Sequence, residues 1–149
     1  MSSTDPIHDV LDRWHHHLRG QLPGGLDALL HEDCVFYSPV VFSPQRGREI
    51  SKLYLSAAAN VLPGDEAAVT PSGDGERHGK FGYTKKIAEG HHAMLEFETM
   101  VGDISVNGVD IITCDDDGMI TEFKVMIRPL QAINLVHEQM KAMLERMSG

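Results

Sequence analysis

The N-terminal half of the chain repeats its apolar residues with the period of amphipathic helices. Within residues 6–18, apolar side chains recur at positions i, i+3, i+4, i+7 and i+11 counted from Ile7, which predicts a helix. Residues 48–62 carry a second apolar face with the same period. Between these helices we expect a short helix over residues 26–31 and a strand over residues 34–39, which ends at a proline.

After residue 80 the helical period changes to the alternation of extended strands. Four strands are expected, paired as two hairpins, over residues 80–88, 91–101, 104–114 and 119–129. Glu89-Gly90 and the acidic run 115–118 supply the turns, since glycine accepts a positive φ at little cost. A helix over residues 130–147 follows, and residues 63–79, rich in Gly, Pro and charge, indicate an exposed loop.

Length and charge narrow the class of protein. The 149 residues suit a single domain over residues 1–149 with its own core. The chain carries 22 acidic and 13 basic side chains, a net charge of −9, which argues against nucleic acid or an anionic membrane as partner. There is no apolar run of membrane-spanning length and no signal-peptide pattern, so we expect a cytoplasmic protein. Cys34 and Cys114 are expected to be buried, reduced thiols.

Helices segregated from an antiparallel sheet predict an α+β domain, with a pocket between the long helices and a strongly curved sheet. Asp110 is conspicuous in this plan because its neighbours Val109 and Ile111 are apolar. A desolvated carboxylate there would have a raised pKa and could donate or accept a proton. The alternative is an outward position, because strand alternation sends every second side chain to the far face.

Three stretches carry a family resemblance: "LHEDCVFYSP" (residues 30–39), "RGREISKLY" (residues 46–54) and "GVDIITCDDDGMITEFKVMIRP" (residues 108–129). In this order they resemble the NTF2-like superfamily, in its SnoaL-like and ketosteroid-isomerase-like branch. The resemblance implies a cystatin-like cone, in which a strongly curved antiparallel sheet wraps three N-terminal helices and an additional C-terminal helix follows. It also implies a homodimer that packs through the outer sheet face. Because this fold hosts enzymes and plain binders, function depends on the site.

The isomerase of this family offers three positions for comparison. Asp110 matches its protonated aspartate. Its base precedes the proline that ends the first strand, where this chain has Ser38, and a gapless count back from Ser38 places Trp14 at its tyrosine. Serine is no base near neutral pH, and indole is a weaker proton donor than phenol. These two departures argue against steroid isomerisation by that mechanism, whereas SnoaL-like cyclases rely on an acidic residue, for which Asp110 is again the candidate.

We expect a pocket in which Asp110 is the acid or base, with Tyr54 or His17 assisting. The expected ligand-contacting residues are Trp14, Tyr37, Ser38, Tyr54, Met94, Asp110 and Met126. Aromatic and methionine side chains suit an adaptable apolar pocket, although core packing is the more common role for each. The consecutive histidines 15–17 cannot converge on one metal ion from a helix, and among them His17 alone borders the apolar stripe while the others face solvent.

Two functions stay open on this sequence. The first, slightly favoured by the missing base and tyrosine, is non-catalytic binding of a small, largely apolar molecule in the internal pocket. The second is a cyclase- or isomerase-type enzyme that uses Asp110 for proton transfer. The sequence has no Gly-rich phosphate loop and no Cys-x-x-Cys pair, so neither a cofactor nor a metal ion is expected. An inward Asp110 beside a second proton donor would favour the enzyme.

Overall fold

The computed structural model describes residues 5–61 and 81–148. The elements in chain order are α1 (Pro6–Leu18), α2 (Leu26–Leu29), β1 (Leu30–Tyr37), β2 (Gln45–Arg46), α3 (Arg48–Val61), β3 (Gly82–Glu89), β4 (His92–Val101), β5 (Ile104–Cys114), β6 (Ile120–Arg128) and α4 (Leu130–Ser148). The predicted loop over residues 63–79 lies outside the described residues. The long helices and the four long strands lie where the sequence pattern predicts them.

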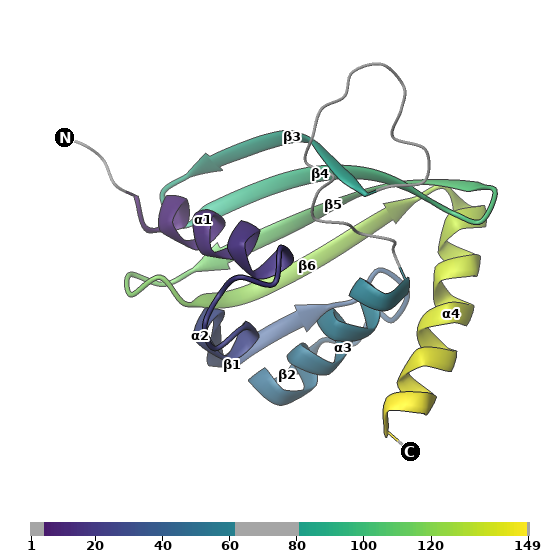
Figure 1. Cartoon of the computed structure of the whole chain (residues 1–149), viewed down its shortest axis with the longest axis horizontal. Helices are drawn as coiled ribbons and strands as arrows, with labels where there is room; N and C mark the ends of the chain where they lie inside the picture. The colour runs from purple at the N-terminus through teal and green to yellow at the C-terminus, as the bar shows by residue number, and fades with distance from the viewer. Residues whose placement is uncertain (1–4, 62–80, 149) are drawn as a thin grey trace.

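The strands of the described residues form one six-stranded sheet in the order β2-β1-β6-β5-β4-β3. Neighbours run antiparallel except β1 and β6, which pair in parallel, with Leu30 opposite Ile120 and Tyr37 opposite Lys124. The sheet curves, α1, α2 and α3 lie over one of its faces, and α4 packs beside α3 (Figure 1). The predicted α+β class with a curved, mostly antiparallel sheet is confirmed, and β1 with β6 is its one parallel pair among the described residues.

Burial along β5 alternates with the pleat of the strand and decides where each side chain points. Val106, Asp110 and Ile112 are buried beneath the helices, whereas Val109 and Ile111 are partly buried and point the other way. We call the side toward the helices the inner face of the sheet and the opposite side its outer face. Asp110 therefore belongs to the inner face.

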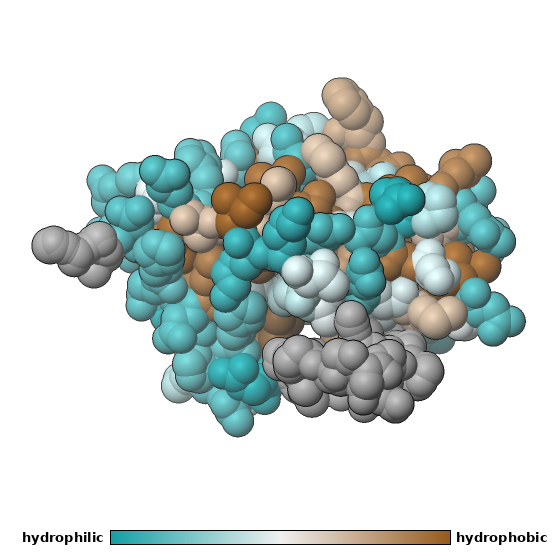
Figure 2. Space-filling view, turned by 90° about the horizontal axis from the view of Figure 1, so that it is seen from above, coloured by the Kyte–Doolittle hydropathy of each residue, from teal (hydrophilic) through white to brown (hydrophobic). Residues whose placement is uncertain are grey.

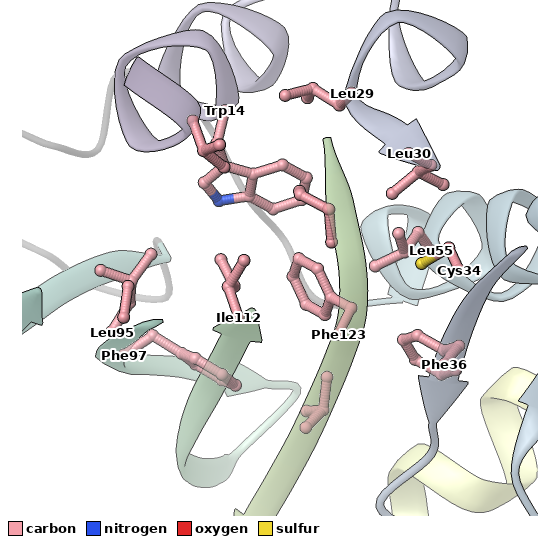
Figure 3. Packing of buried hydrophobic residues seen from close by; sticks show 14 of the residues in the cluster. Trp14, Leu29, Leu30, Cys34, Phe36, Leu55, Leu95, Phe97, Ile112 and Phe123 are labelled. Carbon is pink, nitrogen blue, oxygen red and sulfur yellow. The ribbon is translucent and has the colours of Figure 1, made fainter. Parts of the chain in front are cut away.

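Aromatic rings connect α1 to the inner face. The ring of Trp14 lies 5.1 Å from that of Phe123 on β6, and Phe123 lies 6.2 Å from Phe36 on β1. Leu29 of α2 and Leu30 of β1 are fully buried beside them (Figure 3). Each such buried side chain stabilises the fold by roughly 1.5–3 kcal/mol. This cluster therefore holds the Trp14 side chain in one place against the sheet.

Gly108 allows Phe97 to lie flat across β5. A Cβ atom at position 108 would stand 2.4 Å from the Phe97 Cζ atom and 2.7 Å from the carbonyl oxygen of Met126. Neither contact is sterically allowed, so only glycine fits while Phe97 keeps its position. Phe97 in turn stacks on Phe81, with 4.8 Å between the ring centroids. The inner face near Asp110 is thus built from close aromatic packing.

The start of α1 is tied to the turn between β3 and β4. The Gly90 N–H donates a hydrogen bond of 2.8 Å to the Asp5 carboxylate, and the Ile7 N–H donates one of 3.1 Å to the Gly90 carbonyl. Asp5 therefore binds this turn and makes no side-chain cap of the helix. Gly90 has a φ of +65°, as expected of a glycine in the predicted hairpin turn.

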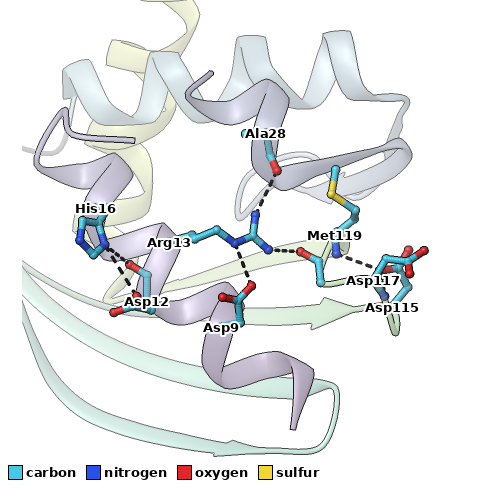
Figure 4. A network of polar contacts seen from close by, with 9 residues as sticks. Asp9, Asp12, Arg13, His16, Ala28, Asp115, Asp117 and Met119 are labelled. Atoms are coloured by element: carbon cyan, nitrogen blue, oxygen red, sulfur yellow. Dashed lines mark hydrogen bonds and ion pairs between the residues drawn. The ribbon is translucent and has the colours of Figure 1, made fainter. Parts of the chain in front are cut away.

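Arg13 joins α1 to two further elements. Its guanidinium donates to the Asp9 carboxylate at 2.9 Å and to the Ala28 carbonyl of α2 at 3.1 Å. It also donates to the carbonyl of Gly118, in the turn between β5 and β6 (Figure 4). The helix that carries Trp14 is therefore fixed by polar contacts at the β3–β4 and β5–β6 turns as well as by the core.

Candidate active site

Asp110 lies within β5, opposite Leu95 of β4 and Val125 of β6. Only 6% of the residue is exposed, and both cross-strand neighbours are buried apolar residues. A carboxyl group in such surroundings is costly to keep charged unless a hydrogen bond or an opposite charge compensates. The partners of its two oxygen atoms therefore decide its chemistry.

Two consecutive hydrogen bonds link Asp110 to β3 and, through β3, to α1. The Tyr83 hydroxyl on β3 donates to the Asp110 Oδ2 atom at 2.8 Å. The Trp14 indole Nε1–H on α1 donates to the Tyr83 oxygen at 3.0 Å. We call these residues the Trp14–Tyr83–Asp110 chain. It brings together three elements, α1, β3 and β5, and two residues that the sequence had singled out.

The pKa values of Asp110 and Tyr83 favour proton exchange at Asp110. Burial raises the pKa of the Asp110 carboxyl to about 7, against a lowering contribution from the Tyr83 hydrogen bond. Burial and the negative charge of Asp110 raise the pKa of Tyr83 well above its ordinary value, so its hydroxyl stays protonated. Near neutral pH the site therefore holds a carboxyl group that can both take and release a proton.

No protein-family model and no curated protein matches the chain. A solved steroid delta-isomerase from Pseudomonas aeruginosa is 29% identical, with a TM-score of 0.81 over 99% of this chain and 97% of that chain. An NTF2-like protein of unknown function from Mesorhizobium loti is 20% identical and shares the fold, with a TM-score of 0.63 over 86% of this chain and 98% of that chain. The chain has the fold of NTF2-like proteins.

A third solved structure supports the cystatin-like fold. It is an uncharacterized bacterial protein with a cystatin-like fold from Silicibacter pomeroyi, 26% identical to this NTF2-like chain. The TM-score is 0.73, over 92% of this chain and 86% of that chain. The resemblance predicted from three stretches of sequence is thereby confirmed, together with the cystatin-like fold that it implied.

Two histidines of α1 flank the Trp14–Tyr83–Asp110 chain of this NTF2-like protein. The His17 ring lies 5.5 Å from that of Trp14, which agrees with its expected place beside the apolar stripe. His15 was expected to face solvent, but its ring lies edge-on to Tyr83 at 5.8 Å. Burial lowers the pKa of both histidines, and the charge of Lys86 lowers that of His15 further. Both rings are therefore neutral at pH 7.

Two other expected site residues have different partners. The Ser38 hydroxyl oxygen accepts hydrogen bonds from the backbone N–H groups of Val40 and Val41, at 3.0 and 3.3 Å. The Tyr54 ring packs on Phe36 with 5.5 Å between the centroids. Within the described part of this NTF2-like chain, neither side chain hydrogen-bonds to Asp110. Their contact with a ligand stays a prediction.

Three expected ligand-contacting residues lie on the outer face of the sheet. The Lys124 ammonium stands 4.8 Å above the Tyr37 ring. Met94 is 39% exposed and Met126 is 51% exposed, and both border a hollow of about 410 Å³ in the outer face. Strand alternation turns these side chains away from Asp110, which corrects the expectation that they share its pocket.

Tyr83 is the member of the chain that the sequence interpretation missed. A signal for it was present, because Phe81 and Tyr83 stand two positions apart at the start of a predicted strand and so share one face. The rings of these two residues pack edge to face at 5.1 Å in the structure. Phe81, just before β3, and Tyr83, within it, both point toward the inner face, and Tyr83 contacts Trp14 of α1 there.

The two cysteine thiols lie apart from the Trp14–Tyr83–Asp110 chain in their chemistry, because neither is ionised at neutral pH. Cys34 and Cys114 are buried free cysteines, and burial raises the pKa of the Cys34 thiol to about 11.

Among residues 5–61 and 81–148, no three His, Cys, Asp or Glu side chains are grouped so as to hold a metal ion. Of the helices described, none is both long and apolar enough to cross a membrane.

Proposed function

We propose that this NTF2-like protein is an isomerase- or cyclase-type enzyme in which Asp110 transfers a proton to or from a small, mostly apolar ketone or enol. The observation that carries the proposal is the inward Asp110 carboxyl, hydrogen-bonded to Tyr83 at 2.8 Å, with a pKa that burial raises to about 7. General acid–base catalysis works best with a group whose pKa lies near the working pH.

The proposed chemistry needs no external reagent. The Asp110 carboxylate takes a proton from the carbon next to a carbonyl group, and the electrons of that C–H bond form an enolate. The resulting carboxylic acid then returns the proton to another carbon of the conjugated system, which regenerates the carboxylate and completes an isomerisation. A carboxyl group held neutral by apolar surroundings can also donate a hydrogen bond to an enolate oxygen.

Non-catalytic binding of the same class of molecule is the second candidate. Ser38 favours it, because this residue stands at the position of the isomerase base and its hydroxyl is engaged by two backbone N–H groups. On sequence alone, the missing base and the missing tyrosine slightly favour binding. The pairing of Asp110 with a second proton donor reverses that preference here.

We also propose that the protein forms a homodimer through the outer face of its sheet. Ile87, Met94 and Met126 are 56%, 39% and 51% exposed there, around a hollow of about 410 Å³. Seen from above the β3 edge, apolar residues interrupt the polar surface (Figure 2). Burying such residues against a second copy would remove apolar area from water.

The enzymatic proposal is tested by turnover of wild-type protein and of Asp110→Asn. The substrates are a β,γ-unsaturated ketosteroid and smaller β,γ-unsaturated ketones, followed by the ultraviolet absorbance of the conjugated enone product. We expect Asp110→Asn to lose about 100- to 10,000-fold in turnover. Asp103→Asn, the same change at an exposed turn residue, is the matched control and should keep wild-type activity. Unchanged turnover in Asp110→Asn would contradict the proposal.

A gain-of-function variant separates the two candidates further. Ser38→Asp restores a carboxylate at the position of the isomerase base, and we expect it to increase the turnover of the ketosteroid if the pocket presents that substrate to Asp110. Wild-type protein that binds these ketones in calorimetry but converts none of them, with or without Ser38→Asp, would favour the binding function.

A further inference from the structure

The Trp14–Tyr83–Asp110 chain has one direction. An indole N–H is a donor and has no acceptor atom, so the Tyr83 oxygen must be the acceptor in its contact with Trp14 at 3.0 Å. The single hydroxyl proton of Tyr83 is then free for another partner. Asp110 Oδ2 lies 2.8 Å away and accepts the hydrogen bond from this hydroxyl group.

We propose that Trp14 and Tyr83 are positioning residues that assign the two oxygen atoms of Asp110 different roles, with Oδ2 as permanent acceptor and Oδ1 as the atom that carries the exchangeable proton. In a protonated carboxyl group the carbonyl-type oxygen is the better acceptor. Because Tyr83 donates to Oδ2, that oxygen keeps carbonyl character and the proton resides on Oδ1.

This assignment narrows the class of ligand, and here the inference rests on the proposed function. A group that meets the protonated Oδ1 atom must accept a hydrogen bond, as a ketone or enolate oxygen does. With an ammonium or amide N–H group, the ligand N–H and the Asp110 Oδ1–H would both be donors, and no hydrogen bond could form between them. The same oxygen then serves as the base once Asp110 is ionised, so proton removal and hydrogen bonding occur at one atom.

Of the side chains packed around Asp110, only Tyr83 contributes a hydrogen bond to it within the described residues. On β4 and β6 the cross-strand neighbours of Asp110 are Leu95 and Val125, which have no polar side-chain atoms. On α1, His15 faces Tyr83 and is kept neutral by burial and by nearby positive charge. Within the described residues, Tyr83 is the one side chain that donates a hydrogen bond to Asp110.

The test is a ¹³C NMR titration of the Asp110 carboxyl carbon in wild-type protein and in three variants, with no ligand present. Tyr83→Phe removes the donor to Oδ2, so the titration midpoint of Asp110 should rise by about one pH unit. Trp14→Phe weakens Tyr83 as a donor and should give a smaller rise. Tyr37→Phe removes the same hydroxyl group on the outer face and should leave the midpoint unchanged.

A midpoint that stays at its wild-type value or falls in Tyr83→Phe would overturn the assignment. Tyr83→Phe keeps the aromatic ring that packs on Phe81 and Phe97, and a retained near-ultraviolet circular dichroism spectrum verifies this packing. If that variant does not fold, Trp14→Phe carries the test, and no rise there would equally contradict the proposal.

Turnover of Asp110→Asn separates this inference from the proposed function. Asparagine keeps a carbonyl oxygen for Tyr83 and puts an NH₂ donor at the place of Oδ1, so it imitates the protonated acid without exchanging a proton. A raised midpoint in Tyr83→Phe with full turnover in Asp110→Asn would support the assignment and contradict the enzyme. Lost turnover with an unmoved midpoint would do the reverse.

Discussion

Two opposing influences act on the Asp110 carboxyl. Burial among apolar strands disfavours its charged form, and the hydrogen bond from Tyr83 favours that form. Desolvation is the larger influence, which brings the pKa to about 7. One strand position earlier, at Val109, the same side chain would face the outer side. The chemistry of the site therefore depends on the register of β5 as much as on the residue type.

The raised pKa of Asp110 predicts how stability depends on pH. The folded protein holds this proton up to about pH 7, whereas the unfolded chain releases it near pH 4. The contribution of Asp110 to the free energy of unfolding is therefore present below about pH 4 and is lost as the pH rises to about 7, by roughly 1.4 kcal/mol per pH unit at most. Urea denaturation at several pH values measures this slope.

Asp110→Asn is the control for that slope, because asparagine does not titrate. The pKa values of His15 and His17 are lowered by burial, so their contributions are lost as the pH falls below about 6.5 and run in the opposite direction. Both histidines are present in both proteins, so the wild-type minus variant difference isolates Asp110. A difference that is independent of pH would contradict the account.

At the scale of residues, the sequence revealed the position of Asp110 but not its partner. The resemblance to the isomerase favours an inward Asp110, whereas strand alternation alone leaves an outward position open. The helical count places Trp14 on the buried stripe. Contact between Trp14 and Tyr83 joins residues 69 positions apart, and it depends on the curvature of the sheet toward α1. Alternation along β4 puts Met94 on the same face as the polar residues His92 and Glu96, so the sequence pattern is sufficient to predict an outward Met94.

Helix α1 is the element that carries the site, since it supplies Trp14 and both flanking histidines. Its position depends on Arg13, which donates to the Ala28 and Gly118 carbonyl groups of two other segments. Substituting Arg13 removes these contacts and leaves two carbonyl groups without that donor. The anchoring of α1 can therefore be tested apart from the chemistry of Asp110.

We expect Arg13→Met to lower the free energy of unfolding by about 1–3 kcal/mol, because it keeps the apolar stem and removes the guanidinium donor. Chemical denaturation measures the loss. Arg19→Met, at an exposed position just after α1, is the matched control and should stay within about 0.5 kcal/mol of wild type. Equal stability of the two variants would show that Arg13 does not anchor the helix.

Among the elements, those with a long periodic pattern were predicted and those without one were not. The strand β2 spans only Gln45–Arg46, too short for alternation to mark it, and it forms by pairing with Val35 and Phe36 of β1. The short helix α2 ends at Leu29 rather than at residue 31, because Leu30 is already extended and pairs with Ile120. The parallel pairing of β1 with β6 depends on the overall chain path, which a local pattern does not encode.

For the whole molecule, the two faces of the sheet separate the proposed chemistry from the proposed assembly. If the outer face joins two copies, wild-type protein should sediment as a dimer at micromolar concentration, and Met126→Lys should shift it to monomer. Leu130→Lys puts the same charge on a residue that is 71% exposed at the start of α4, and it should leave the dimer intact. Monomeric wild-type protein, or a dimeric Met126→Lys variant, would contradict the proposed interface.

The central claim is that Asp110 exchanges its proton near neutral pH on the inner face of this NTF2-like fold. The most direct measurement is the titration midpoint of its ¹³C-labelled carboxyl carbon in wild-type protein, with the signal identified by its absence in Asp110→Asn. The account predicts a midpoint close to pH 7. A midpoint close to pH 4, the value of a solvated aspartate, would contradict it.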